Sequence, residues 1–112
     1  MEYKIRLYQV KPAFLREYGY RGYKEMVREF HEPRIRRDVY DLAWEGETYK
    51  TPNKDQLFWD LNLPDRKPKD YTGRSMSVSD LLEFPDLGEL WYCDSLGWKR
   101  VEWFKPADWK ED

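Results

Sequence analysis

The polar residues best suited to contact a partner are concentrated in one short segment, TGRSMSVSD at positions 72–80. Gly73 can adopt backbone conformations that other residues avoid, and the guanidinium of Arg74 can pair with a carboxylate such as Asp70 or Asp94. Together with backbone amides and serine hydroxyls, they would form a recognition loop. The candidate contact residues of this segment are Gly73, Arg74, Ser75, Ser77, Ser79 and Asp80.

The same segment also has a purely structural interpretation. If it forms a strand, the period of two places Met76 and Val78 inward and the serine hydroxyls outward. Asp80 would then either cap a short helical turn, with Glu83 completing a capping box, or lead directly into a strand through LLEF. The sequence leaves recognition and architecture open as alternatives.

Catalytic chemistry has few candidate residues in this chain. His31 is the only histidine and Cys93 the only cysteine, and their spacing gives no reason to expect a thiol–imidazole pair. The motifs of a nucleophile elbow, a phosphate-binding loop and a dinucleotide site are absent from the sequence. A divalent-metal hydrolase would draw its ligands from scattered carboxylates, namely Asp38, Asp41, Asp60, Asp65, Asp80 and Asp94. We therefore expect no enzyme activity, no metal and no cofactor.

A nucleic-acid-binding surface is a second hypothesis, because the charges are unevenly distributed. Residues 1–37 contain ten Lys/Arg and five Asp/Glu, a balance of +5, whereas residues 38–112 contain ten and seventeen, a balance of −7. Arginines can pair with phosphates and the neighbouring tyrosines can stack on bases, although interleaved glutamates dilute the charge. The residues that would carry this binding are Arg21, Lys24, Arg28, Arg34, Arg36 and Arg37.

Length and composition are those of one small folded domain. The chain has 112 residues, of which 38% are charged and 18% aromatic. Disordered chains lack aromatic residues, so this composition predicts an aromatic core beneath a very polar surface. Neither a membrane-spanning apolar run nor a signal-peptide core occurs, and a single cysteine permits no internal disulfide. A cytoplasmic location is the simplest expectation.

Five segments have the pattern of strands. Alternation predicts a strand at residues 2–10, and a second one at residues 39–45 with Tyr40, Leu42 and Trp44 on one face. The runs LLEF and ELWYCD flank PDLG, whose proline and glycine predict the turn of a hairpin. A last strand, GWKRVEWF, follows the tight turn DSLG.

Three segments have the pattern of helices. They are residues 13–18, ended by Gly19; residues 23–30, with one apolar face; and a helix after Thr51, which we expect to be its N-cap. The buried stripe of the third helix would consist of Leu57, Phe58 and Leu61. The sequence thus predicts a single α+β domain over residues 1–105, with about five strands in a mostly antiparallel sheet and two or three helices, followed by a polar tail at 106–112.

Several of these segments together resemble one family. YTGRSMSVSDLLEF followed by WYCDSLGWKRV is similar to the pattern of the YodL-like family, in which a G-[HR]-S-[LM]-S-V-S-D segment precedes a hairpin strand and a D-S-x-G-[FW] turn. YKIRLYQV, VYDLAWEGE and LFWDLNLPDRKPKDYTG resemble the strands, helix and loop that come earlier in the family pattern. The resemblance extends from about residue 3 to residue 103.

The resemblance implies a setting and a role. Members of the family are common in conjugative elements and phages of Firmicutes and are regarded as accessory or counter-defence factors that act on host proteins. It implies a non-enzymatic interaction module whose partner is a bacterial host protein, contacted by the residues of the 72–80 loop. The turn that follows adds Asp94, Ser95 and Trp98 to the candidate contact residues.

Overall fold

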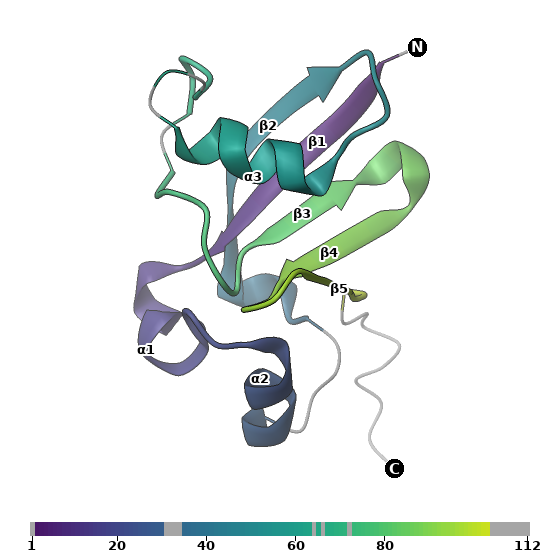
Figure 1. Ribbon diagram of the computed structural model, residues 1–112. Helices are drawn as coiled ribbons and strands as arrows, with labels where there is room; N and C mark the ends of the chain where they lie inside the picture. The colour runs from purple at the N-terminus through teal and green to yellow at the C-terminus, as the bar shows by residue number, and fades with distance from the viewer. Residues whose placement is uncertain (1, 31–34, 64, 66, 72, 104–112) are drawn as a thin grey trace.

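The computed structural model describes residues 2–30, 35–63, 65, 67–71 and 73–103 of the chain (Figure 1). Its strands are β1 (Tyr3–Val10), β2 (Tyr40–Thr48), β3 (Leu81–Phe84), β4 (Glu89–Cys93) and β5 (Trp98–Arg100). Its α-helices are α1 (Leu15–Tyr18), α2 (Tyr23–Phe30) and α3 (Lys54–Asn62), with 3-10 turns η1 (Pro12–Phe14), η2 (Arg37–Val39) and η3 (Pro85–Leu87). The predicted α+β domain, with five strands and three helices, is confirmed.

The five strands form one antiparallel sheet in the order β2-β1-β3-β4-β5. The N-terminal strand therefore lies inside the sheet, where Leu7 is paired with Leu82 of β3 on one side and with Trp44 of β2 on the other. Outside the strands, a parallel bridge joins Ile35 to Trp103. None of the helices within the described ranges has the length and apolar character that crossing a membrane requires.

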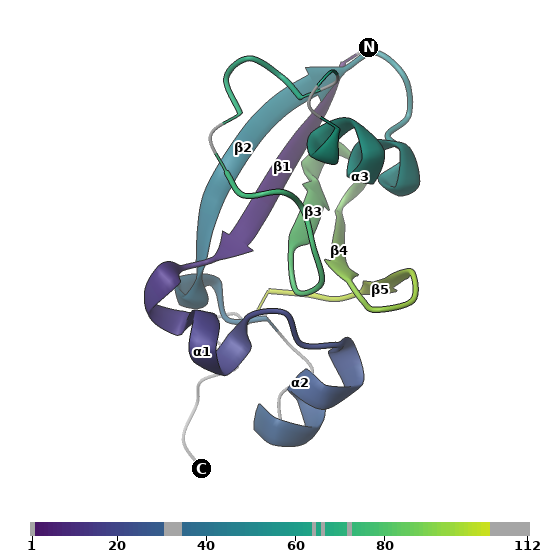
Figure 2. The same ribbon diagram turned by 60° about the vertical axis from the view of Figure 1, so that its left-hand side comes forward.

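Each face of the sheet has its own buried core, since successive side chains of a strand point to opposite faces. One core contains Ile5 and Leu7 of β1 and is covered by Leu61 of α3. The other contains Tyr8 and Val10 together with Met26 of α2. Helix α3 crosses one face, whereas α1 and α2 lie together at the end of the molecule where β1 finishes (Figures 1 and 2).

The prediction that Tyr40, Leu42 and Trp44 share one face of their strand is wrong. The register changes between Leu7, which is opposite Trp44, and Tyr8, which is opposite Leu42, so the β2 strand contains one extra residue. This bulge reverses the alternation within β2. As a result Tyr40 belongs to one core, Trp44 packs against the other, and Leu42 is 46% exposed.

The helices begin and end close to the predicted residues, with one correction at α3. The N-cap of α3 is Asn53, whose side-chain oxygen accepts the Gln56 N–H at 2.9 Å, and not Thr51. The expected stripe is present, because Leu61 is buried and Leu57 and Phe58 pack against the same core. Asparagine is among the preferred N-cap residues, because its side-chain oxygen can accept the backbone N–H of the residue three positions later.

Both predicted turns are present, and both need a glycine. Gly88, after the 3-10 turn of PDLG, has φ +64°, and Gly97 in DSLG has φ +83°. These left-handed conformations close the β3–β4 and β4–β5 hairpins. The strand after DSLG is shorter than predicted, since β5 ends at Arg100. The expected tail at 106–112 lies outside the described residues.

Candidate functional site

The GRSMSVSD segment (residues 73–80) is held by hydrogen bonds to side chains of β1 and α3. Gln9 of β1 donates Nε2 to the Arg74 carbonyl at 2.9 Å and to Asp80 Oδ2 at 3.0 Å, and its Oε1 accepts the Arg74 N–H at 2.9 Å. At the end of α3, the Asn62 side-chain amide accepts the Met76 N–H and donates to the Met76 carbonyl. The segment therefore connects β1 to α3.

Gly73 and Arg74 both face the fold. A Cβ on Gly73 would lie 2.7 Å from Gln9 Oε1 and 3.0 Å from the Ala43 Cβ, so a larger residue would force its neighbours apart. The Arg74 guanidinium donates to the Val10 carbonyl at 3.3 Å from each of its two terminal nitrogens, where we had expected an acidic partner. Both residues are half-buried.

The GRSMSVSD segment is not a strand, and its serines do not all face outward as predicted. Met76 is buried and Val78 half-buried, as expected. Ser75 is exposed and Ser77 half-buried, but Ser79 is only 2% exposed. The strict alternation fails because Val78 and Ser79 form a turn.

Ser79 has an unusual backbone conformation that three hydrogen bonds maintain. Its φ is +86°, a region that costs a residue with a side chain about 1–3 kcal/mol. Its N–H donates to the Cys93 carbonyl at 2.9 Å and its carbonyl accepts the Tyr40 hydroxyl at 2.7 Å. Its hydroxyl oxygen accepts the Tyr20 N–H at 3.0 Å, which ties the linker between α1 and α2 to the segment.

Asp80 is a buried carboxyl group, 1% exposed, at the start of β3. Its Oδ2 accepts the Ser77 N–H at 2.9 Å and the Gln9 amide at 3.0 Å, so it closes a turn within the segment and caps no helix. Burial raises the pKa of Asp80 to about 7, against the lowering effect of these two donors and of the Arg74 guanidinium. This group therefore titrates in the neutral range.

The turn between β4 and β5 lies next to the N-terminus of α2. Asp94 Oδ1 accepts the Tyr23 N–H at 3.0 Å and the Ser95 N–H at 2.8 Å, so this carboxylate joins the turn to the first residue of α2. Trp98, the third predicted residue of this region, points elsewhere: its Nε1 donates to Asp55 Oδ1 of α3 at 3.1 Å. The structure thus separates Trp98 from Asp94 and Ser95.

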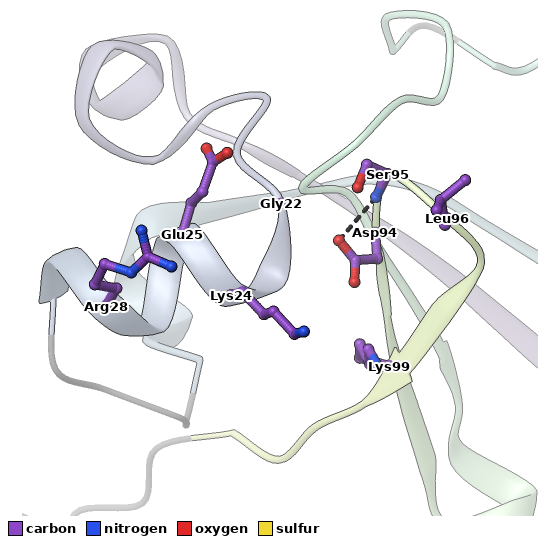
Figure 3. A pocket seen from close by; sticks show the side chains of 8 residues that line it. All are labelled: Gly22, Lys24, Glu25, Arg28, Asp94, Ser95, Leu96 and Lys99. Atoms are coloured by element: carbon purple, nitrogen blue, oxygen red, sulfur yellow. Dashed lines mark hydrogen bonds between the residues drawn. The ribbon is translucent and has the colours of Figure 1, made fainter.

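An open pocket of about 460 Å³ lies between α2 and this turn (Figure 3). Its α2 wall consists of Lys24, Glu25 and Arg28, and the opposite wall consists of Asp94, Ser95 and Leu96, with Lys99 of β5. Lys24 points from the helix toward the turn, and the Asp94 carboxylate points back toward α2 (Figure 3). The pocket therefore contains predicted residues of both hypotheses. Asp94 and Ser95 are candidate contacts for a host protein, and Lys24 and Arg28 are candidates for binding nucleic acid.

The predicted basic residues do not form one continuous face. Lys24 and Arg28 line the pocket, but Arg36 pairs with Asp38 at 2.8 Å and the Arg37 guanidinium lies 4.6 Å from the centre of the Tyr8 ring. Arg21 donates Nε to the Glu17 carbonyl at 2.6 Å. Arg34 and His31 lie outside the described residues. Charges that already have partners contribute less to a phosphate-binding surface.

The expected carboxylate ligands are equally dispersed. In the part of the chain that the structure describes, no three His, Cys, Asp or Glu side chains come together as a metal site would require. Cys93 is 5% exposed, and burial, with Asp80 and Asp94 nearby, raises the pKa of its thiol to about 12. The thiol is therefore protonated at neutral pH and a poor nucleophile.

Two residues that line the pocket were missed by the sequence analysis. They are Leu96, which is 91% exposed at the tip of the turn, and Lys99 of β5. Tyr20, one of the tyrosines of the nucleic-acid hypothesis, lies in the α1–α2 linker and is 59% exposed with φ +60°. For Leu96 the signal was its position in the tight DSLG turn, since such turns lie at the protein surface. Lys99 is two residues beyond the turn, but no sequence signal places α2 opposite it.

Comparison with known proteins gives one match. The family model of the YodL-like domain matches residues 4–104, nearly the whole chain. Neither a curated protein nor a solved structure matches it. The matched region includes the GRSMSVSD segment and the DSLG turn, the two parts that carry the resemblance in the sequence. The chain belongs to the YodL-like domain family.

Proposed function

We propose that this chain is a non-enzymatic protein-interaction module of a mobile element or phage, and that it binds and interferes with a bacterial host protein. The contact surface we assign is the pocket between α2 and the β4–β5 turn, with Leu96 at its rim. The setting in mobile elements of Firmicutes follows from the family resemblance. The mechanism is occlusion of the host protein's surface.

The exposure of Leu96 is the observation that carries this proposal. A leucine that is 91% exposed at a turn tip gains nothing from folding, whereas burying it against a partner contributes about 1.5–3 kcal/mol. Tyr20 is a second exposed apolar side chain at the same end of the molecule, because its backbone is bonded to Ser79 and Ser79 in turn to Cys93. Tyrosine is a frequent anchor of protein interfaces.

The GRSMSVSD segment has a supporting role in this proposal. Ser79 N–H bonds to the Cys93 carbonyl, and the Cys93 N–H bonds to the Asp80 carbonyl at 2.8 Å, one residue before Asp94. The segment thereby fixes the start of the turn. That residues of the GRSMSVSD segment contact the partner directly remains a prediction. Ser75 is the best candidate, because it is the exposed serine of the segment.

Binding of nucleic acid is the alternative that the same experiment must address. It is less favoured because Arg36 and Arg37 already have partners in Asp38 and Tyr8. An oligonucleotide-binding protein would lose affinity steeply with added salt, since counterion release drives such association.

The test compares three tagged proteins in a pull-down from Firmicute lysate: wild type, Leu96→Ser and Leu87→Ser. Leu87 is the matched control, because it is an exposed leucine in the turn of the other hairpin. The captured protein is then purified, and its Kd is measured for each variant. We expect Leu96→Ser to weaken binding about tenfold or more, as for an interface anchor, with Leu87→Ser unchanged.

Circular dichroism and the melting temperature establish that the variants are folded. Equal capture by all three proteins, or salt-sensitive capture of nucleic acid in place of a protein, would refute the assigned surface. Arg74→Ala separates the two roles of the GRSMSVSD segment: as a support it should lower the melting temperature, because the Val10 carbonyl loses its donors. Lost binding at an unchanged melting temperature would make Arg74 a contact residue.

A further inference from the structure

The pocket between α2 and the β4–β5 turn carries three cationic side chains from two elements, namely Lys24 and Arg28 of α2 and Lys99 of β5. None of the three forms an ion pair with another residue in the described part of the chain. Arg6, in contrast, binds Glu45 at 2.6 Å. Unpaired cations that converge on a concave surface attract an anionic partner.

The two acidic residues of the pocket do not cancel this charge. Asp94 and Glu25 face three cations, which leaves a formal balance of +1 on a chain whose total charge is −2. Asp94 Oδ1 already accepts two backbone N–H groups, from Tyr23 and Ser95. The side chains of Lys24 and Glu25 extend in different directions, and Lys24 is the one directed at the turn (Figure 3).

The pocket also has an apolar lining residue, Leu96, in addition to the three cations. Leu96 lines the pocket and is 91% exposed, so its apolar side chain is available to a partner that enters the pocket. A partner that satisfied the cations alone would leave Leu96 in water. A partner that contacts both the cations and Leu96 presents an anionic group and an apolar side chain in the same segment.

We infer that this pocket binds a segment of the partner protein that contains both acidic and aliphatic residues. A carboxylate of this segment would lie between Lys24 and Lys99, and an aliphatic side chain would pack against Leu96. The inference rests on the proposed function and adds the chemistry of the partner. A phosphate backbone supplies the charge but no aliphatic group for Leu96, so an acidic protein segment fits better than nucleic acid.

The first test uses a defined probe: an acetylated and amidated peptide of three Glu-Glu-Leu repeats, titrated into ¹⁵N-labelled protein. Two control peptides contain Lys-Lys-Leu and Glu-Glu-Ser repeats. We expect the first peptide to shift the amide signals of residues 22–28 and 94–99 in a saturable way and to leave those of α3 unchanged. The control peptides, each lacking one of the two features, should bind at least about fivefold more weakly.

Charge-reversal variants test the assigned residues. Lys99→Glu should weaken binding of the Glu-Glu-Leu peptide about tenfold, because it removes one attraction and adds one repulsion. Lys50→Glu is the matched control, since Lys50 is an exposed lysine just beyond the end of β2 and does not line the pocket. The end of β2 and helix α2 lie at opposite ends of the molecule (Figure 1). Equal weakening by both variants, or tighter binding of the Lys-Lys-Leu peptide, would overturn the inference.

The two proposals fail in different ways. If a host protein is captured through Leu96 but its Kd is unchanged by Lys99→Glu, the proposed function stands and the acidic chemistry is wrong. If the Glu-Glu-Leu peptide binds at the pocket but no host protein depends on Leu96, the chemistry stands and the function is wrong. Binding of duplex or single-stranded oligonucleotides at residues 22–28 and 94–99, without binding of the peptide, would replace the acidic segment by nucleic acid.

Discussion

Replacing Asp80 with asparagine should remove a large pH-dependent contribution to stability between pH 5 and pH 8. Asparagine has nearly the same shape, and its Oδ1 can accept the donors that Asp80 Oδ2 accepts, the Ser77 N–H and the Gln9 amide. It cannot ionise. The difference in free energy of unfolding between wild type and Asp80→Asn therefore isolates the titration of this one carboxyl group from that of all others.

The magnitude follows from the raised pKa of Asp80. Burial raises it from 3.8 to about 7, and each pKa unit corresponds to about 1.4 kcal/mol of unfolding free energy. Because the native state holds its proton more tightly than the unfolded state, this stability is complete below about pH 4. It is lost as the pH rises toward 7. Over the accessible window from pH 5 to pH 8, the wild type should lose about 3 kcal/mol relative to Asp80→Asn.

The assay is urea unfolding of both proteins at pH 5, 6, 7 and 8, followed by tryptophan fluorescence. The unfolding free energy of the wild type should fall relative to the variant by about 1.4 kcal/mol per unit between pH 5 and pH 7, and then level off. A difference that stays constant across the window would refute the reasoning. It would mean that the hydrogen bonds of Gln9 and Ser77 outweigh burial and keep Asp80 ionised throughout.

Three further substitutions test the contacts that hold the fold. Gly73→Ala should lower stability by about 1–3 kcal/mol in chemical denaturation, since the new Cβ would lie 2.7 Å from Gln9 Oε1; unchanged stability would contradict the tight packing. Tyr40→Phe, which removes the donor to the buried Ser79 carbonyl, should cost about 1–3 kcal/mol, and an unchanged midpoint would show that this bond does not hold the turn. Asn53→Ala should lower stability by about 1 kcal/mol through loss of the α3 cap, with no effect expected from Thr51→Ala.

The sequence predicted the elements of this fold well where a period or a turn residue carried the information. The strand at residues 2–10, the helix at 23–30 and both hairpins agree with the structure because alternation, the 3.6-residue period and glycine-containing turns are local signals. The bulge in β2 was missed because it depends on pairing with β1, between Leu7 and Tyr8. The register between two paired strands cannot be predicted from the hydrophobic pattern of one of them.

The candidate site was harder to predict, for a related reason. Serines spaced by two predicted outward hydroxyls, but Ser79 is buried because Tyr20, Tyr40 and Cys93, far apart in the chain, each bond to it. Several polar groups of the GRSMSVSD segment take part in a buried hydrogen-bond network, whereas Ser75 is exposed. Polar residues satisfy such a network as readily as they bind a partner, and sequence alone does not separate the two.

The hydrogen bonds of Ser79 and Asp80 connect the buried network to the two walls of the proposed contact pocket. The turn that carries Leu96 begins at Cys93, whose backbone is bonded on both sides to Ser79 and Asp80. The linker that leads into α2 is bonded to the same Ser79 hydroxyl. Both walls of the pocket are thus positioned by two consecutive residues of the GRSMSVSD segment. A substitution that disturbs Ser79 or Asp80 should therefore weaken binding at the pocket without touching the partner, whereas a substitution of Leu96 should weaken binding without disturbing the fold.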